Sequence, residues 1–230
     1  MTTPVRRFAW PLALAAGALA GAAAAGPRVT ETADALARGD CELEVATGRE
    51  SSSGTPAVRS LEAVVGCGVG GNTQLGLGWA RVTAAGLHAD GVALLGKTTL
   101  VAPDAARTGW AVAYSLFADK PPGGSFKSEE LAVSGVATRE LLPGWLLHAN
   151  LGWSHSRSGK QNSTVWFLGV ESTDELAVAA DVYGDDRSKP WVSAGVGYTL
   201  GGGVSASLSY ALQLDRPRVR AFTLGAKLAF

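Results

Sequence analysis

Apolar and polar side chains alternate with a period of two along most of the chain after residue 40, which is the pattern of a β-strand with one apolar face. Four segments show it cleanly. Their apolar faces are Trp110, Val112, Tyr114 and Leu116; Trp145, Leu147, Ala149, Leu151 and Trp153; Leu176, Val178, Ala180 and Val182; and Val204, Ala206, Leu208, Tyr210 and Leu212. Tryptophans at both ends of the second face suit the two interfaces of a membrane.

Twelve strands are predicted, and the fourth is the least regular because Val92 to Lys97 does not alternate well. Their ranges are 41–50, 57–67, 72–82, 87–100, 107–118, 127–139, 144–155, 162–172, 175–184, 190–200, 203–213 and 219–230. Most odd-numbered links after the first are polar and charged, and most even-numbered links are short. The link from Val101 to Ala106 is longer than this scheme expects.

An even number of strands with long loops on one side and short turns on the other is typical of an all-β, transmembrane, antiparallel up-and-down β-barrel of about 12 strands. Such a barrel places both chain ends on the periplasmic side of the outer membrane of a Gram-negative bacterium. Twelve strands about 4.8 Å apart and tilted near 40° give a backbone radius of roughly 12 Å.

The last strand ends the chain on an aromatic residue. Phe222, Leu224, Ala226, Leu228 and Phe230 share one face. The spacing of Thr223, Gly225, Leu228 and Phe230 resembles the assembly signal of outer-membrane proteins, which implies the barrel assembly machinery and outer-membrane lipid as partners. An ordinary amphipathic strand that ends a soluble sandwich is the alternative.

Residues 1–25 have the three parts of a secretory signal peptide: Arg6 and Arg7, an apolar stretch, and an alanine-rich exit. An uncleaved anchor helix is the alternative, but the run is short and dominated by alanine. Residues 26–40 are expected to form a short periplasmic N-terminal segment with at most a turn of helix, and residues 41–230 form the barrel. No later segment is long and apolar enough for a transmembrane helix, so a membrane role requires closed strands.

The two cysteines, Cys41 and Cys67, are predicted to form a disulfide, since export places them where disulfides persist. A hairpin centred near Gly54 sets Leu43 opposite Val65 and Cys41 directly opposite Cys67, at a separation that a disulfide can bridge. Lipid attachment at Cys41 fits less well, because charged residues precede it. A metal site lacks further ligands. No metal or other cofactor is expected.

Composition supports a barrel with a lumen lined by small residues. The chain has 30 Gly, 7 Trp and 1 Met, and hydrophobic residues reach 47% without long blocks after the signal peptide. A formal net charge of zero gives no basic footprint for nucleic acid. We expect one domain and a monomer.

Several polar residues fall on the face opposite the apolar one and are therefore candidates to face the lumen: Glu42, Glu44, Glu62, His148, Asn150, Asp181 and Lys227. Because the last strand pairs with the first in a closed barrel, Lys227 is expected near Glu42 or Glu44. Either this group is a structural ion-pair cluster that fixes closure, or it filters solutes by charge.

An enzyme is the main alternative class, because some outer-membrane lipid hydrolases are small barrels with a His and a Ser on one face. None of the three histidines has a hydroxyl two positions away on its own face: His148 precedes Asn150, His155 precedes Arg157, and His88 precedes Asp90. The sequence therefore favours no catalytic residues. A structural or surface-interaction barrel with a closed lumen is a further alternative.

The segment Gly144 to Ser154 resembles the matching stretch of the phenol-degradation MetA-pathway family of outer-membrane transporters, and so do the acidic lead-in from Glu31 to Glu44 and the aromatic-ended last strand. This resemblance implies a porin-like barrel that passes small, often hydrophobic or aromatic, compounds. The sequence thus favours a passive outer-membrane channel or transporter for small solutes.

Overall fold

The computed structural model describes residues 28–230 and contains twelve β-strands. They are β1 (Cys41–Ser51), β2 (Val58–Gly70), β3 (Thr73–Ala84), β4 (Leu87–Val101), β5 (Gly109–Lys120), β6 (Lys127–Leu142), β7 (Trp145–Ser156), β8 (Gln161–Ser172), β9 (Leu176–Asp185), β10 (Trp191–Gly201), β11 (Val204–Gln213) and β12 (Arg220–Ala229). In the described residues, no helix is long and apolar enough to cross a membrane.

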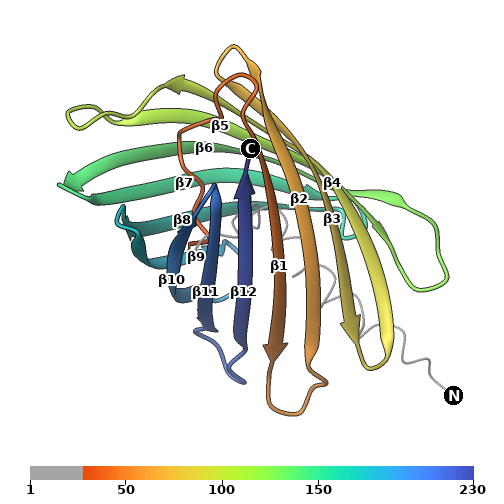
Figure 1. Ribbon diagram of the computed structural model, residues 1–230. Helices are drawn as coiled ribbons and strands as arrows, with labels where there is room; N and C mark the ends of the chain where they lie inside the picture. Colours follow the sequence, from red (N-terminus) through yellow and green to blue (C-terminus); the bar gives the residue numbers. More distant parts are fainter. Residues whose placement is uncertain (1–27) are drawn as a thin grey trace, which may run out of the picture.

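Each strand pairs with its neighbour in sequence, and β1 pairs with β12, so the sheet closes into an antiparallel barrel (Figure 1). At the seam the backbones of Cys41 and Phe230 exchange two hydrogen bonds, of 2.8 and 2.9 Å. Closure leaves no strand edge unpaired. The predicted fold class and strand order are confirmed.

The two ends of the barrel differ. The terminal end holds Cys41 and Phe230 together with short turns such as 71–72, 143–144 and 202–203. The opposite end, called the loop end below, carries longer connections such as 121–126, 186–190 and 214–219. On the terminal end, residues 102–108 form the long link expected from the sequence, and Arg107 and Asp104 pair across it at 3.0 Å.

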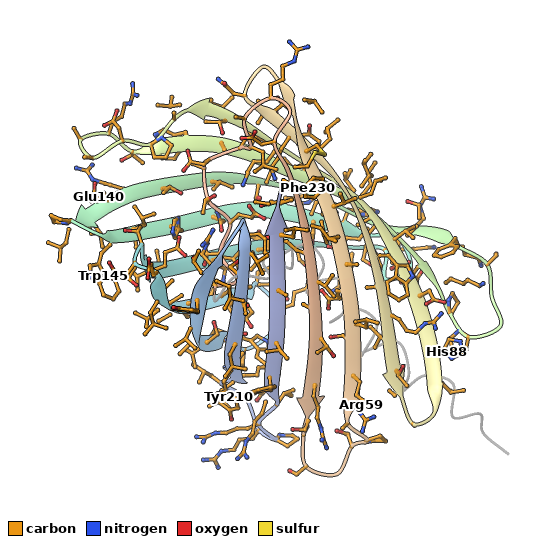
Figure 2. All side chains as sticks on the ribbon, viewed as in Figure 1. Arg59, His88, Glu140, Trp145, Tyr210 and Phe230 are labelled. Carbon is orange, nitrogen blue, oxygen red and sulfur yellow. A yellow bond between two sulfur atoms is a disulfide. The ribbon has the colours of Figure 1, made fainter. Side chains whose placement is uncertain are left out.

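Side chains alternate between an exposed apolar exterior and a smaller, more polar interior (Figure 2). Leu77 and Leu151 on the outside are 62% and 65% exposed, whereas Val136 on the inside is fully buried. The weak alternation in β4 has a simple cause. Leu95 faces the interior, where it packs on Ala80, Ala93 and Phe117.

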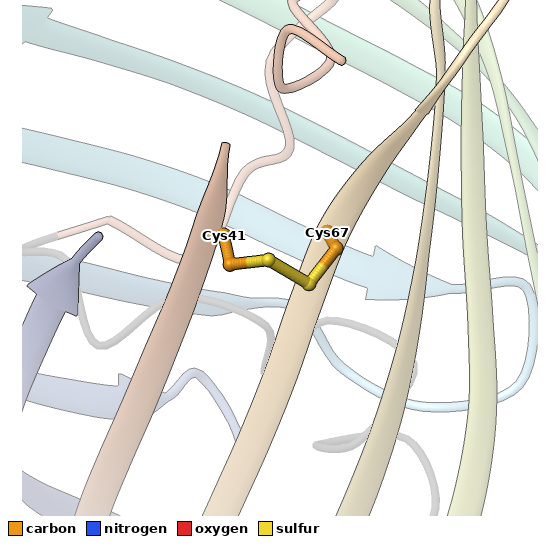
Figure 3. Close-up of a disulfide and its surroundings, with 2 residues drawn as sticks. All are labelled: Cys41 and Cys67. Atoms are coloured by element: carbon orange, nitrogen blue, oxygen red, sulfur yellow. A yellow bond between two sulfur atoms is a disulfide. The ribbon is translucent and has the colours of Figure 1, made fainter. Parts of the chain in front are cut away.

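Cys41 and Cys67 form a disulfide between β1 and β2 (Figure 3). The register sets Cys41 opposite Cys67 and Leu43 opposite Val65, as the hairpin argument predicts. Both cysteines lie on the same outward parity as Leu43 and Val65. The bond therefore joins the two strands on the outside of the wall, at the terminal end.

Residues 1–25, the predicted signal peptide, lie outside the described residues. The sequence predicts a short periplasmic segment at residues 26–40 that precedes the barrel. In the structure, the described part of this segment lies within the barrel. Residues 28–39 run along the inside of the barrel wall and form no helical turn. This stretch is called the lumenal segment below.

We expect the disulfide to stabilise the barrel, because it closes a chain segment with a sequence separation of 26 residues. Closing a loop of that length removes about 3 kcal/mol of unfolded-state entropy. A variant with both Cys41→Ser and Cys67→Ser should unfold at lower urea concentration than the oxidised protein, measured by the shift of the folded band on a denaturing gel. The reduced wild-type protein is the control and should match the variant. Equal stability of the oxidised and reduced proteins would contradict the prediction.

Candidate functional site

The lumenal segment is the main feature of the barrel interior. Figure 1 shows it in red and orange, passing from the start of β1 across the inside of the ring toward β8 and β9. It has no regular secondary structure of its own, so its backbone groups need partners from elsewhere. Inward side chains of the barrel wall provide many of them.

The first part of the segment binds carboxylates on β8 and β9. Asp181 accepts hydrogen bonds from the backbone N–H groups of Val29 and Thr30, at 3.2 and 3.3 Å, and from the Thr30 hydroxyl at 2.5 Å. Ser193 donates to the same carboxylate at 3.1 Å. The Arg28 guanidinium pairs with Glu171. Asp181 thus accepts four hydrogen bonds from uncharged donors, whereas the positively charged Arg28 pairs with Glu171.

The middle of the segment is bound by an amide and an ammonium. Asn150 accepts from the Glu31 N–H at 3.0 Å and donates to the Glu31 carbonyl at 3.2 Å. Lys97 Nζ lies 3.0 Å from the Glu31 carboxylate. Burial opposes ionisation of Glu31, but Lys97 and, more weakly, Arg28 outweigh it and lower its pKa. Glu31 is therefore held as a carboxylate.

Two threonines hold the next residues. The Ala33 N–H donates to the Thr138 hydroxyl at 2.9 Å, and the Thr99 hydroxyl donates to the Ala33 carbonyl at 2.6 Å. Thr99 also accepts from the Ala35 N–H at 2.9 Å. Ala33 is fully buried as a result. A hydroxyl suits this position because it donates and accepts at once.

The segment returns to the wall at β2, where it approaches the backbone closely. The Gly39 N–H donates to the Gly68 carbonyl at 3.0 Å, and the Gly68 N–H donates to the Asp40 carbonyl at 2.9 Å. A Cβ atom at Gly68 would lie only 2.0 Å from the Ala37 carbonyl oxygen. At the other end of the segment, a Cβ atom at Gly169 would lie 2.6 Å from the Thr30 hydroxyl. Glycine at both positions makes room for the segment.

A buried hydrogen-bonded chain joins Thr138, His148 and Glu171 beneath the segment. The Thr138 hydroxyl lies 3.0 Å from His148 Nδ1, and His148 Nε2 lies 3.2 Å from Glu171. The Thr138 oxygen also accepts the hydrogen bond from the Ala33 N–H. The order hydroxyl, imidazole, carboxylate is that of a hydrolase triad. Here, however, Thr138 and His148 are almost fully buried under Ala33, so the chain supports the segment.

The predicted lumen-facing residues fall into three groups. Lys227 lies 3.6 Å from Glu42 and 3.7 Å from Glu44, across the seam between β12 and β1, as the sequence predicts. His148, Asn150 and Asp181 belong to the contacts of the lumenal segment. Glu62 also has inward parity on β2. It lies two residues before Val64, which is directly opposed to Glu44.

A cavity of about 70 Å³ lies between the segment and the β1 to β6 side of the wall. Glu31 and Lys97 line one side of it, and Glu42 and Glu44 line another. A space of this size has room for a few waters. Charged side chains face it beside the segment, together with apolar ones such as Val64 and Leu95.

Nearer the loop end, three aromatic rings stack on the inner wall across β8, β9 and β10. Phe167 and Tyr183 are directly opposed, with ring centroids 5.7 Å apart. Tyr183 and Trp191 are also opposed, with centroids 6.3 Å apart. This apolar surface narrows the lumen on one side.

Sequence reasoning missed Lys97, Thr99, Thr138 and Glu171 as contacts of the segment. Strand alternation does place all four on inward parities. What the sequence lacks is any sign that residues 28–39 enter the barrel, since their partners lie on strands far away in the chain. Within residues 28–230 no group of three or more His, Cys, Asp or Glu side chains is arranged to hold a metal ion.

Comparison with known proteins places the chain in a family. Residues 12–230 match the family model described as "Uncharacterised conserved protein UCP029691". The chain belongs to the UCP029691 family. No curated protein matches the sequence.

Solved structures share the fold of this UCP029691 protein at low sequence identity. The COG4313 outer membrane channel from Pseudomonas putida F1 has a TM-score of 0.66 at 10% identity, covering 86% of this chain and 97% of that chain. The NanC porin has a TM-score of 0.60 at 11% identity, covering 81% and 98%. The translocator domain of the autotransporter NalP from Neisseria meningitidis has a TM-score of 0.53 at 14% identity, covering 96% and 97%. These likenesses show a common barrel fold.

Replacing Gly68 with alanine should loosen the lumenal segment, because the new methyl group would overlap the Ala37 carbonyl. Losing the two hydrogen bonds between Gly68 and residues 39 and 40 costs about 1 kcal/mol each. Amide hydrogen exchange of residues 36–40 should then speed up by about tenfold or more. The control is Gly66→Ala on the same inner face of β2, where a Cβ atom meets nothing closer than 3.9 Å. Equal exchange in both variants would contradict the close-approach argument.

Acid should release the middle of the segment. A carboxyl whose pKa is lowered on folding contributes stability above its ordinary pKa, here 4.5, and loses it as the pH falls through the lowered value. Exchange at Glu31 and its neighbours, relative to the intrinsic rate, should stay constant from about pH 7 to pH 5 and rise below about pH 4. In Glu31→Gln the rise should be weaker and protection at neutral pH lower. A wild-type profile that Glu31→Gln leaves unchanged would assign the acid response to other groups.

Proposed function

We propose that this protein is a passive outer-membrane channel for small solutes. The observation that supports it most directly is the contrast between the two faces of a closed barrel. The outside is an apolar belt, and the inside is lined by small and polar side chains around a cavity that Glu31, Glu44 and Lys97 help to line. Only closed barrels and helices satisfy every backbone group in lipid. An exposed belt of leucine, valine and tryptophan is stable in lipid and costly in water.

The orientation follows from the connections. The terminal end, with its short turns, the start of β1 and the end of β12, is proposed to face the periplasm, and the loop end to face outward. The lumenal segment then lies on the periplasmic half of the pathway. It restricts the lumen to the space beside it, so the channel conducts weakly and admits only small solutes.

The lumen favours cations at the level of the segment. Its inward carboxylates include Glu31, Glu42, Glu44, Glu62, Glu171 and Asp181, and its inward cations include Arg28, Lys97 and Lys227. Each cation is paired, and Lys227 is shared by two carboxylates. Acidic side chains in excess around a narrow pathway raise the local concentration of cations and exclude anions.

The resemblance to the phenol-degradation MetA-pathway transporters supports a finer proposal, in which the solutes include hydrophobic or aromatic compounds. The stacked rings of Phe167, Tyr183 and Trp191 offer an apolar surface for a planar solute near the loop end. A cationic or neutral solute with a planar apolar part suits both this surface and the acidic lumen.

A structural barrel with a closed lumen is the second candidate. The observation that favours it is the tight binding of the lumenal segment, with Thr30 and Ala33 fully buried against the wall. In that case the segment blocks the lumen permanently, and the loops carry the function.

Conductance in a planar lipid bilayer distinguishes the two candidates. Under a potassium chloride gradient, the protein should give small steps with a reversal potential that shows cation preference. One unit charge about 7 Å from an ion in water contributes about 0.6 kcal/mol, close to RT. The same charge repels an anion by that amount, so Glu44→Gln should lower the cation-to-anion permeability ratio by a factor of about seven.

Asp174→Asn, in a turn at the terminal end, is the control and should leave that ratio almost unchanged. No conductance at all would contradict the channel and favour the closed barrel. Conductance with no cation preference would leave the channel standing and contradict the role of the lumenal carboxylates.

A further inference from the structure

Basic side chains gather on the outside of the barrel near its loop end. Arg49, Arg59, Arg81 and Arg220 lie on the neighbouring strands β1, β2, β3 and β12, and all four are exposed. They share outward parity with the lipid-facing residues of those strands, such as Leu61, Leu77 and Phe222. Figure 2 shows Arg59 at the end of the barrel opposite Phe230. These four residues are called the rim arginines below.

The register brings the rim arginines side by side. Arg49 and Arg59 are directly opposed on β1 and β2, and Arg220 is opposed to Ser51, two residues after Arg49. Directly opposed residues on one face of an antiparallel pair have Cβ atoms about 5 Å apart, and like charges there repel each other. A cross-strand pair of arginines is therefore unfavourable unless an anion lies between or above them.

The protein itself provides little negative charge here. Arg81 pairs with Asp90 through two hydrogen bonds, of 2.7 and 3.2 Å. Within residues 28–230, Arg49, Arg59 and Arg220 form no ion pair and no side-chain hydrogen bond. The neighbouring Glu50 has the opposite parity and faces the interior. The adjoining loop adds positive charge on balance, since its exposed Arg216 and Arg218 outnumber its one acidic residue, Asp215.

The level of the rim arginines is that of a membrane interface. Arg49 is opposed to Phe222 on β12, and Phe222 is opposed to Tyr210 on β11, so guanidinium and aromatic rings form one row around the wall. Aromatic side chains of barrels gather where the acyl chains meet the headgroups. An arginine at that depth costs little, whereas one at the bilayer midplane costs several kcal/mol. The guanidinium groups therefore reach the layer of lipid headgroups.

We propose that the rim arginines bind the phosphate groups of the phosphorylated glycolipid that forms the outer leaflet of the outer membrane. The planar guanidinium donates two parallel hydrogen bonds to phosphate oxygens, which makes arginine the preferred partner of fixed phosphates. The acyl chains of the same lipid lie along the apolar outer face of β1, β2 and β12. This proposal rests on the proposed membrane orientation, in which the loop end faces outward, and not on conduction through the lumen.

Lipid binding to the full mature protein in detergent micelles tests it. Native mass spectrometry with bisphosphorylated lipid A should show a bound lipid, and dephosphorylated lipid A should bind at least about tenfold more weakly. The variant with Arg49→Gln and Arg59→Gln should lose affinity for the phosphorylated lipid by a similar factor. Arg139→Gln is the matched control, since Arg139 is an exposed outward arginine at the terminal end, and it should bind like the wild type.

Each other outcome would overturn the proposal in an identifiable way. Equal binding of phosphatidylglycerol would indicate a general site for anionic lipids, and competition by inorganic phosphate at low concentration would indicate a site for the free ion. Unchanged affinity in the double variant would remove the rim arginines from lipid binding. Gel mobility of the unboiled variant verifies that the barrel is intact. Its bilayer conductance should equal that of the wild type, so failure of this proposal and failure of the channel are separate results.

Discussion

The closed ring of backbone hydrogen bonds is the constraint on which the rest of this structure depends. In lipid, an unpaired N–H or C=O group costs several kcal/mol, so the first and last strands must meet. They meet through the backbones of Cys41 and Phe230 and through the ion pairs of Lys227 with Glu42 and Glu44. A disulfide fixes β1 to β2 beside the same seam. Backbone hydrogen bonds and ion pairs thus hold the seam, and the disulfide fixes β1 to its other neighbour at the same end of the barrel.

Closure creates an interior, and the interior has its own requirement. Carboxylates and amides that face away from lipid need partners, and several of them, such as Asp181 and Asn150, are buried. Asp181, Asn150 and Thr138 find these partners in the backbone of residues 29–33. The same contacts satisfy a chain segment that has no secondary structure. Segment and wall therefore complete each other's hydrogen bonding, which explains why an irregular stretch of chain is stable inside the barrel.

Much of the fold could be predicted from the sequence, because one face of each strand is apolar and the period of two fixes which residues share it. The first hairpin shows this best, since the pairing of Leu43 with Val65 and Cys41 with Cys67 follows from matching apolar faces about a turn. The ion pairs of Lys227 follow from closure alone. Alternation failed at Leu95 because an apolar residue can also pack inward, against Ala80, Ala93 and Phe117.

The lumenal segment and the rim arginines could not be predicted in the same way, because neither is a local pattern. Residues 28–39 contact strands from β2 to β9, and only the three-dimensional ring brings Gly68 and Asp181 to one segment. Likewise, Arg59 and Arg220 are far apart in sequence, and closure places them within one row.

The net charge of zero hides this arrangement. Carboxylates in excess line the lumen, while arginines collect outside at one rim, and the two sets cancel in the sum. Balanced composition therefore says little about the partners of a closed barrel, since its inner and outer faces meet different molecules.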